Sequence, residues 1–199
     1  MSKVFWDERY NSDEFVYGKQ PNAFFQEQLD KLKSGKLLLP CEGEGRNAVY
    51  AAQKRWKVDA YDFSSIAHQK ALQWADAKGV KIQYTVEEIE NIVLPTNYYD
   101  AVGLIYAHMH PSFRSTFHKA CAESLAIGGT LILEAFEKKQ LKNSSGGPKD
   151  SSMLYSVEEL LNDFQSIQIE SCTKATIELN EGPYHQGIAD VVRLVAKKK

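Results

Sequence analysis

Short apolar runs alternate with helical patterns along most of the chain, and this alternation constrains the fold more than any other feature. The strand-like runs lie at residues 36–39, 57–61, 80–86, 100–106 and 130–136. Helical patterns lie at residues 22–32, 47–56, 64–77, 111–126 and 156–164. Strands that alternate with helices predict a mainly parallel sheet with helices on both faces.

The C-terminal end adds a different element. Two long strand-like runs, 168–180 and 187–196, flank Glu181-Gly182-Pro183, which suits a hairpin connection. The expected fold is therefore α/β and Rossmann-like, with a mainly parallel seven-stranded sheet and an antiparallel strand in the C-terminal hairpin. A length of 199 residues fits a single domain over 1–199.

Local signals mark several boundaries inside this domain. Ser64 is expected to cap the helix that carries Ala67, Ala71 and Ala75 at four-residue spacing, and Ser156 with Glu159 forms a capping box. Residues 1–35 are expected to form a helical lid. The polar stretch 138–152 is expected to be a flexible loop, because long loops inside compact domains are functional or poorly ordered.

Composition excludes several classes of partner. Lys and Arg number 24 against 26 Asp and Glu, so a net charge of -2 gives no electrostatic reason to expect nucleic acid. No apolar run approaches the roughly 20 residues that cross a bilayer, so no membrane association is expected. Three widely spaced cysteines suggest neither disulfides nor a metal site, and they indicate a reduced, cytoplasmic protein. The oligomeric state is not predicted.

A glycine-containing segment follows the first strand. Gly43-Glu44-Gly45 lies between that strand and its helix, where ligands bind in open α/β sheets. Glycines there adopt positive φ and let the backbone approach a ligand closely. Asp62 follows Gly45 by 17 residues and ends the second strand. Its carboxylate can accept two hydrogen bonds from a ribose diol, so the pattern indicates a nucleoside ligand.

The residues alone leave the choice of nucleoside open. Gly43–Ala48 also fits Gly-x-Gly-x-x-Ala, the dinucleotide pattern, so an NAD(P)-dependent oxidoreductase is one alternative. A non-catalytic module that binds an adenosyl cofactor is the other alternative.

The order of segments resembles the class I S-adenosylmethionine-dependent methyltransferases. The resemblance rests on the glycine motif Pro40–Asn47, Asp62, the acidic turn Glu87-Glu88, the strand Tyr99–Ile105, the turn and strand Leu125–Leu133, and the closing hairpin. It spans the chain from Trp6 to Val195 and implies the Rossmann-like methyltransferase fold with S-adenosylmethionine as the cofactor.

Two N-terminal segments are similar to those of small bacterial methyltransferases of the tellurite-resistance and thiopurine types. They are Trp6-Asp7-Glu8-Arg9-Tyr10 and Tyr17-Gly18-Lys19-Gln20-Pro21-Asn22. One departure concerns the end of the first strand. Many members of the family hold an acidic residue and, two residues later, a glycine, where this chain has Leu39 and Cys41.

The resemblance implies a set of cofactor-binding residues. Gly43 and Gly45 would run beside the methionine half of the cofactor and Asp62 would hold the ribose. Phe63 would pack on the adenine, with Glu87 or Glu88 near its amine. The full set is Pro40, Glu42, Gly43, Gly45, Arg46, Asn47, Asp62, Phe63, Glu87 and Glu88.

The acceptor is expected to be a small molecule, because the Asn/Asp-Pro-Pro-aromatic segment of many base-methylating enzymes is missing. Methyl transfer is an in-line displacement, for which alignment and exclusion of water supply most of the rate. Tyr106, His108 and His110 follow the fourth strand and are the catalytic candidates. The substrate candidates are Tyr10, Tyr17, Arg114, Glu134 and His185.

Several of these residues also allow plainer readings. His108 and His110 are equally compatible with loop histidines that only shape the cleft. Their His-x-His spacing is found in metal sites, but no third ligand lies nearby, so no metal is expected. Arg114 can also lie on the helix surface, and Tyr10 and Tyr17 can also be core aromatics.

Overall fold

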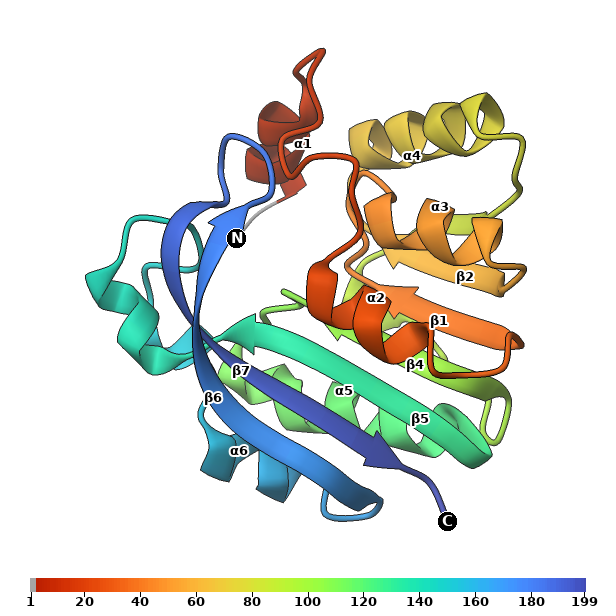
Figure 1. Cartoon of the computed structure of the whole chain (residues 1–199), viewed down its shortest axis with the longest axis vertical. Coiled ribbons are helices and arrows are strands. Elements are labelled where there is room, and N and C mark those ends of the chain that lie inside the picture. The colour runs from red at the N-terminus through yellow and green to blue at the C-terminus, as the bar shows by residue number, and fades with distance from the viewer. Residues whose placement is uncertain (1–2) are drawn as a thin grey trace.

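The computed structural model describes residues 3–199 and contains a seven-stranded sheet in the order β3-β2-β1-β4-β5-β7-β6 (Figure 1). Neighbours from β3 to β5 pair in parallel, whereas β7 runs antiparallel to both β5 and β6. The strands are β1 (Lys36–Pro40), β2 (Lys57–Asp62), β3 (Gln83–Val86), β4 (Tyr99–Ile105), β5 (Leu125–Phe136), β6 (Gln168–Asn180) and β7 (Gln186–Lys197). The expected mainly parallel sheet with an antiparallel C-terminal strand is confirmed.

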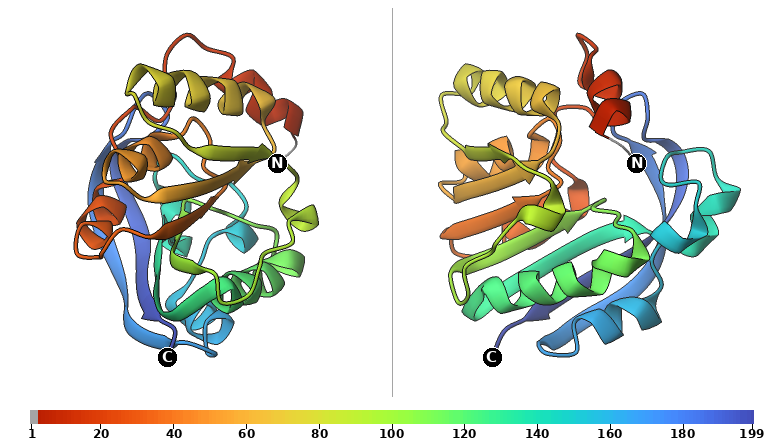
Figure 2. Two further views of the ribbon diagram at one scale, coloured as in Figure 1. Left: turned by 90° about the vertical axis from the view of Figure 1, so that its right-hand side faces the viewer. Right: turned by 180° about the vertical axis from the view of Figure 1, so that it is seen from behind.

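Helices cover both faces of the sheet, as expected (Figure 2). Because successive side chains of a strand point to opposite faces, Leu37 and Leu39 of β1 lie in one core and Leu38 in the other. The helices are α1 (Lys3–Tyr10), α2 (Ala23–Leu29), α3 (Arg46–Gln53), α4 (Ser65–Ala77), α5 (Pro111–Ser124) and α6 (Val157–Asp163). Helices α2, α3 and α4 pack on the first core, and α5 and α6 on the second.

The local boundary signals are confirmed by the structure. Ser64 accepts a hydrogen bond from the Ala67 amide at the start of α4, and the three alanines at four-residue spacing are the buried residues of that helix. Ser156 and Glu159 form the reciprocal capping box of α6. These features depend on residues close in sequence, which is why the sequence predicts them.

Two strand boundaries differ from expectation. Strand β3 begins at Gln83 rather than at Val80, because the Val80 amide bonds to the Ala75 carbonyl and completes the end of α4. Strand β5 begins at Leu125 rather than after Gly129, since Leu125 pairs with Tyr99 of β4. The Gly128 amide also donates to the Lys198 carbonyl, and the Lys198 amide donates to the Gly129 carbonyl. These two hydrogen bonds extend the pairing of β5 with the C-terminal end.

The polar stretch 138–152 lies on β7. It contains two short 3-10 helices, η2 (Lys138–Lys142) and η3 (Ser151–Met153), and a third, η1 (Ile89–Asn91), follows β3. Within the stretch Gln140 and Ser145 are buried. Gln140 accepts from the Asp190 amide and the Ser145 hydroxyl donates to the Ile188 carbonyl, so two buried side chains hold this loop against the sheet.

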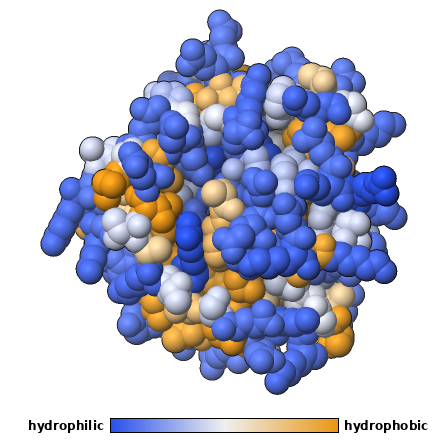
Figure 3. All heavy atoms as spheres, in the orientation of Figure 1, coloured by the Kyte–Doolittle hydropathy of each residue, from blue (hydrophilic) through white to orange (hydrophobic). Residues whose placement is uncertain are grey.

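The surface is mainly polar. Hydrophilic residues cover most of the face seen in Figure 3, and apolar residues show as separate patches between them. No helix within residues 3–199 is long and apolar enough to cross a membrane.

Candidate active site

The glycine loop lies at the carboxyl end of β1 and begins with an unusual cysteine. Cys41 has φ of 56°, in the left-handed region, and Gly43 and Gly45 follow with φ of 61° and 86°. A non-glycine residue pays a conformational cost in that region, whereas glycine adopts it freely. Burial raises the pKa of the Cys41 thiol, so the side chain is a neutral thiol near pH 7.

Gly45 brings helix α3 close to α4. A β-carbon at Gly45 would lie 2.7 Å from the Ala71 β-carbon, so a larger residue would push the two helices apart. The amino end of α3 is therefore held at the edge of the sheet, with its free backbone N–H groups at the glycine loop.

Glu42 satisfies two of those N–H groups. Its Oε1 accepts from the amides of Asn47 at 2.8 Å and Ala48 at 2.7 Å, and the side chain is buried. Burial outweighs these bonds and raises the pKa of the Glu42 carboxyl from 4.5 to about 7. The Glu42 carboxylate therefore caps the amino end of α3.

Replacing Glu42 by Gln is expected to make stability less dependent on pH. A carboxyl whose pKa is raised by folding destabilises the folded state increasingly as pH rises from 4.5 to about 7. The free energy of unfolding of the variant, relative to wild type, should therefore rise by about 3 kcal/mol between acidic and neutral pH. Urea unfolding across that range measures it. Glu8→Gln replaces an exposed acid and is the control. If the free energy of unfolding of Glu42→Gln relative to wild type did not change with pH, the raised pKa of Glu42 would be refuted.

Asp62 links the glycine loop to the end of β2. Its Oδ2 accepts from the Gly43 amide at 3.0 Å and its Oδ1 from the Ser64 amide at 2.9 Å. Burial raises the pKa of the Asp62 carboxyl to about 6, against the effect of these amides. Each oxygen keeps a further lone pair, so the carboxylate can still accept from a ligand diol.

The remaining adenosine candidates lie at the same edge. The Glu87 amide donates to the Asp62 carbonyl, which places the acidic turn beside the end of β2. Glu87 is half-buried and accepts from the Asn91 amide side chain, whereas Glu88 is exposed. Phe63 is half-buried. Pro40 is buried at the end of β1, directly before the loop.

The N-terminal segment covers the glycine loop. A β-carbon at Gly43 would lie 2.7 Å from the Tyr10 hydroxyl, so the Tyr10 ring lies directly over this glycine. Trp6 stacks on Tyr10 with ring centroids 5.4 Å apart, and Asp7 bonds to the Ser64 hydroxyl. Helix α1 lies beside α4 in Figure 1. These contacts hold α1 against the glycine loop and the start of α4.

Glu44, the residue between the two glycines, fastens this segment. Its Oε2 accepts from the Val16 amide at 2.8 Å, and its Oε1 lies 2.5 Å from Lys70 Nζ. Lys70 also donates to the carbonyls of Ser12 and Glu14. The sequence analysis missed Glu44, although an acid between two motif glycines was the available signal.

A second cluster surrounds Glu134 at the end of β5. The side chain is fully buried and accepts from the Asn22 side chain at 2.6 Å, the Tyr106 hydroxyl at 2.9 Å and Arg193 Nε at 2.6 Å. Tyr106 has φ of 52°, which turns the chain directly after β4. Two substrate-side candidates, Glu134 and Tyr106, thus meet, and Asn22 and Arg193 are partners that the sequence analysis missed.

Arg46 and Asn47 turn toward this cluster. Arg46 donates to Glu181 Oε2 at 2.9 Å and to the Tyr17 carbonyl at 3.1 Å. Asn47 accepts from the Asn22 amide at 2.9 Å. Both residues were expected at the cofactor, but in this structure their side chains join helix α3 to the β6–β7 turn and the N-terminal segment.

Aromatic rings gather around His185, which lies in the β6–β7 turn. Its ring centroid lies 4.4 Å from that of Tyr17, 4.7 Å from that of Tyr106 and 5.3 Å from that of Phe136. Four distant chain segments therefore meet at one place, next to the glycine loop.

His108 has no free ring nitrogen. Nδ1 bonds to the Met153 carbonyl at 2.7 Å, and Nε2 accepts from the Phe136 amide at 3.1 Å. Burial lowers the pKa of His108 to about 4, so it is neutral near pH 7. A general base needs a free nitrogen, and this arrangement argues against the base role expected for His108.

His110 and Arg114 lie outside the cluster. His110 is exposed and caps α5 by accepting from the Ser112 amide. Arg114 donates to Asp163 at 2.8 Å and to Glu159 at 3.2 Å, which ties α5 to α6. Their side chains are engaged in helix capping and helix packing rather than directed to the cleft that the sequence analysis expected.

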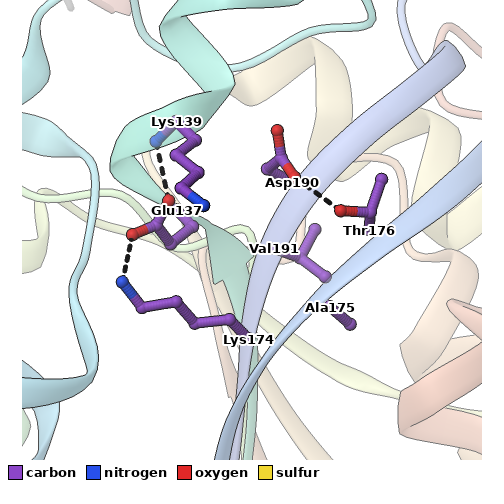
Figure 4. A pocket seen from close by; sticks show the side chains of 7 residues that line it. All are labelled: Glu137, Lys139, Lys174, Ala175, Thr176, Asp190 and Val191. Atoms are coloured by element: carbon purple, nitrogen blue, oxygen red, sulfur yellow. Dashed lines mark hydrogen bonds and ion pairs between the residues drawn. The ribbon is translucent and has the colours of Figure 1, made fainter.

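A separate cavity of about 100 Å³ lies along β6 and β7 (Figure 4). Both of its carboxylates accept hydrogen bonds within the cavity lining, since the Lys174 ammonium donates to Glu137 at 2.7 Å and the Thr176 hydroxyl donates to Asp190 at 2.7 Å. None of its lining residues comes from the glycine loop. Among residues 3–199, no three His, Cys, Asp or Glu side chains are placed to hold a metal ion.

Solved structures share this fold at low identity. A structure described by the conversion of a disulfide bond into a thioacetal group during echinomycin biosynthesis has a TM-score of 0.79 at 15% identity, covering 100% of this chain and 92% of that chain. TehB from Haemophilus influenzae has a TM-score of 0.73 at 16% identity, covering 99% and 67%. The N-methyltransferase NodS from Bradyrhizobium japonicum, in complex with S-adenosylhomocysteine, has a TM-score of 0.70 at 12% identity. The match covers 98% of this chain and 97% of NodS.

A comparison with protein-family models also indicates a methyltransferase. A family model described as a methyltransferase domain matches residues 39–129, which contain the glycine loop, Asp62 and β4. Residues 39–129 are therefore similar to a methyltransferase domain, and the chain has the fold of class I methyltransferases. No curated protein sequence matches the chain.

These similarities support S-adenosylmethionine as the cofactor, because NodS, which shares the fold, is in complex with S-adenosylhomocysteine. The residues present fit it, because the left-handed glycine loop and the buried Asp62 carboxylate meet at one edge of the sheet. The cofactor supplies an electrophilic methyl group on a sulfonium. The chain supplies the site that binds it.

Proposed function

We propose that this protein transfers the methyl group of S-adenosylmethionine to a small-molecule acceptor by in-line displacement. The observation that carries the proposal is the cluster of Tyr17, Tyr106, Glu134 and His185 beside the glycine loop. The cluster is buried or half-buried under the N-terminal segment and the β6–β7 turn, which suits a small acceptor better than a macromolecule.

The residues fall into three groups in this proposal. Gly43, Gly45 and Asp62 bind the cofactor, together with the adenosine side formed by Phe63 and the acidic turn. Tyr106 and His185 face the acceptor, with Tyr10 and Tyr17 closing the site from the N-terminal segment. Glu134 holds Tyr106 in place through the hydrogen bond to its hydroxyl.

The description of one neighbour supports a small acceptor, because it names a step of echinomycin biosynthesis. We also propose that the protein works in a reducing cytoplasm, because its cysteines 41, 121 and 172 are all free thiols. We propose that it acts without nucleic acid, because its net charge of -2 gives no electrostatic attraction to a polyanion.

A methylation screen with labelled S-adenosylmethionine tests the proposal. The acceptors should include phenols, amines, thiols, halides and chalcogen oxyanions. We expect label in at least one small acceptor and none in RNA, DNA or protein. Transfer confined to macromolecules would contradict the small-molecule assignment, and cofactor binding without any transfer would favour a non-catalytic module.

A further inference from the structure

The β6–β7 turn contains a carboxylate–imidazole pair. His185 Nδ1 lies 3.2 Å from Glu181 Oε2, and His185 is only 5% exposed. Glu181 also accepts from Arg46 at 2.9 Å and from Asn22 at 3.2 Å. Although burial opposes ionisation, the hydrogen bonds and charges of His185 and Arg46 lower the pKa of the Glu181 carboxyl to about 2. An ionised carboxylate only accepts hydrogen bonds, so Nδ1 carries the proton of the neutral ring and Nε2 is left as the acceptor.

Gly146 packs against the Cδ2–Nε2 edge of this ring and brings no side chain to it. A β-carbon at Gly146 would lie 2.7 Å from His185 Cδ2 and 3.2 Å from Nε2, so only glycine fits beside this edge. Gly146 also has φ of 129°, which a side chain would oppose. Among the described residues none hydrogen-bonds to Nε2, in contrast to His108, whose two nitrogens are both engaged.

The surroundings keep His185 neutral near pH 7. Burial is the largest cause and lowers its pKa below 6.5, while Glu181 acts in the opposite direction. The titratable and charged groups that face or contact the ring are Glu181, Arg46, Arg9, Tyr17, Tyr106 and His108. A neutral imidazole with one free nitrogen is the form that a general base requires.

We propose that His185 is the general base of methyl transfer, that Glu181 positions it, and that the acceptor is therefore a phenol, alcohol or amine. The inference rests on the proposed function. As the acceptor atom bonds to the methyl carbon, the carbon–sulfur bond breaks and its electron pair stays on sulfur as S-adenosylhomocysteine. The acceptor proton moves to Nε2, the Glu181 carboxylate stabilises the imidazolium, and the proton then leaves to solvent.

The proposal separates acceptors by whether they lose a proton. A phenol or an aromatic amine is a weak nucleophile until its proton is removed, so it needs the base. Iodide has no proton to lose and would react without it. Substitution of His185 should therefore lower transfer to phenols and amines but not to iodide. A purely structural role of the β6–β7 turn would lower transfer to both kinds of acceptor alike.

The test compares phenol, aniline and iodide as acceptors for wild type, His185→Gln, His185→Ala and Glu181→Gln. We expect kcat on phenol or aniline to fall about 100-fold or more in both His185 variants. Exogenous imidazole should partly restore His185→Ala, and transfer to iodide should be unchanged. In Glu181→Gln the acidic limb of the kcat profile should move to lower pH. His110→Asn, which keeps the helix cap, is the matched control.

Two kinetic results would overturn the dyad while leaving methyl transfer intact. One is an unchanged kcat and pH profile in His185→Gln with phenol or aniline. The other is transfer confined to iodide and similar anions. Failure of S-adenosylmethionine to bind the wild-type chain would instead overturn the proposed function, so the two failures are distinguishable.

A measurement without any acceptor tests the same geometry. Nitrogen-15 NMR of the histidine rings, assigned by the signals lost in His185→Gln, reports which nitrogen carries the proton. We expect His185 as the Nδ1–H tautomer near pH 7, with Nε2 unprotonated. An Nε2–H tautomer would overturn the proposal, because the base nitrogen would then already hold a proton.

Discussion

Replacing Asp62 by Ala is expected to weaken binding of S-adenosylmethionine by about 100-fold. The variant would lose two hydrogen bonds to the ribose diol, each worth about 1.5 kcal/mol for a charged acceptor. The amides of Gly43 and Ser64, which lie 3.0 and 2.9 Å from the Asp62 carboxylate, would also lose their acceptor, and the glycine loop would loosen. Isothermal titration calorimetry with S-adenosylhomocysteine measures the change without turnover.

Asp59→Asn is the matched control for Asp62. Asp59 lies three residues earlier on β2 and accepts from the Tyr99 hydroxyl, away from the glycine loop. Asp62→Asn keeps an acceptor oxygen and should fall between Asp62→Ala and wild type. An unchanged affinity in Asp62→Ala would refute the ribose assignment.

Replacing Glu134 by Ala is expected to lower the free energy of unfolding by about 3–5 kcal/mol, the usual cost of breaking a buried ion pair. Glu134 is fully buried, and its removal leaves Arg193, the Asn22 side chain and the Tyr106 hydroxyl without their shared acceptor. Urea unfolding followed by circular dichroism measures the change in the cofactor-free protein.

Glu134→Gln separates the lost charge from the lost shape. The amide keeps an oxygen for some of the three donors, so its effect should be smaller than that of Ala. Glu178→Ala, an exposed acid on β6, should change stability by no more than about 0.5 kcal/mol. A loss under about 1 kcal/mol in Glu134→Ala would contradict a central role for this cluster.

Features that depend on neighbouring residues were predictable from the sequence. Ser64 and Ser156 begin helices because their side chains accept from amides within the first turn. The position of Asp62 at the end of β2, beside the glycine loop, follows from the regular alternation of strands and helices. The antiparallel strand β7 follows from the hairpin residues at 181–183.

The substrate side was less predictable, because its contacts join residues far apart in sequence. Asn22 reaches both Glu134 and Glu181, and Arg46 reaches Glu181 across the sheet edge. None of these pairs has a sequence spacing that marks it. Asn22 showed only as a helix cap, which it also is, since the Phe25 amide donates to it.

The roles of the histidines were also hard to predict from the sequence. His108 and His110 follow strand β4, where catalytic residues are common, yet one bonds to two backbone groups and the other caps a helix. Spacing alone cannot tell a histidine with two engaged nitrogens from one with a free nitrogen. The difference between His108 and His185 depends on Met153, Phe136 and Glu181, which only the fold brings close.

Titration of the purified chain with S-adenosylmethionine, S-adenosylhomocysteine and NAD by calorimetry tests the central assignment most directly. We expect both adenosyl cofactors to bind the wild-type chain, with affinity that depends on Asp62, and we expect no heat of binding with NAD. Binding of NAD in the absence of binding to either adenosyl cofactor would contradict it.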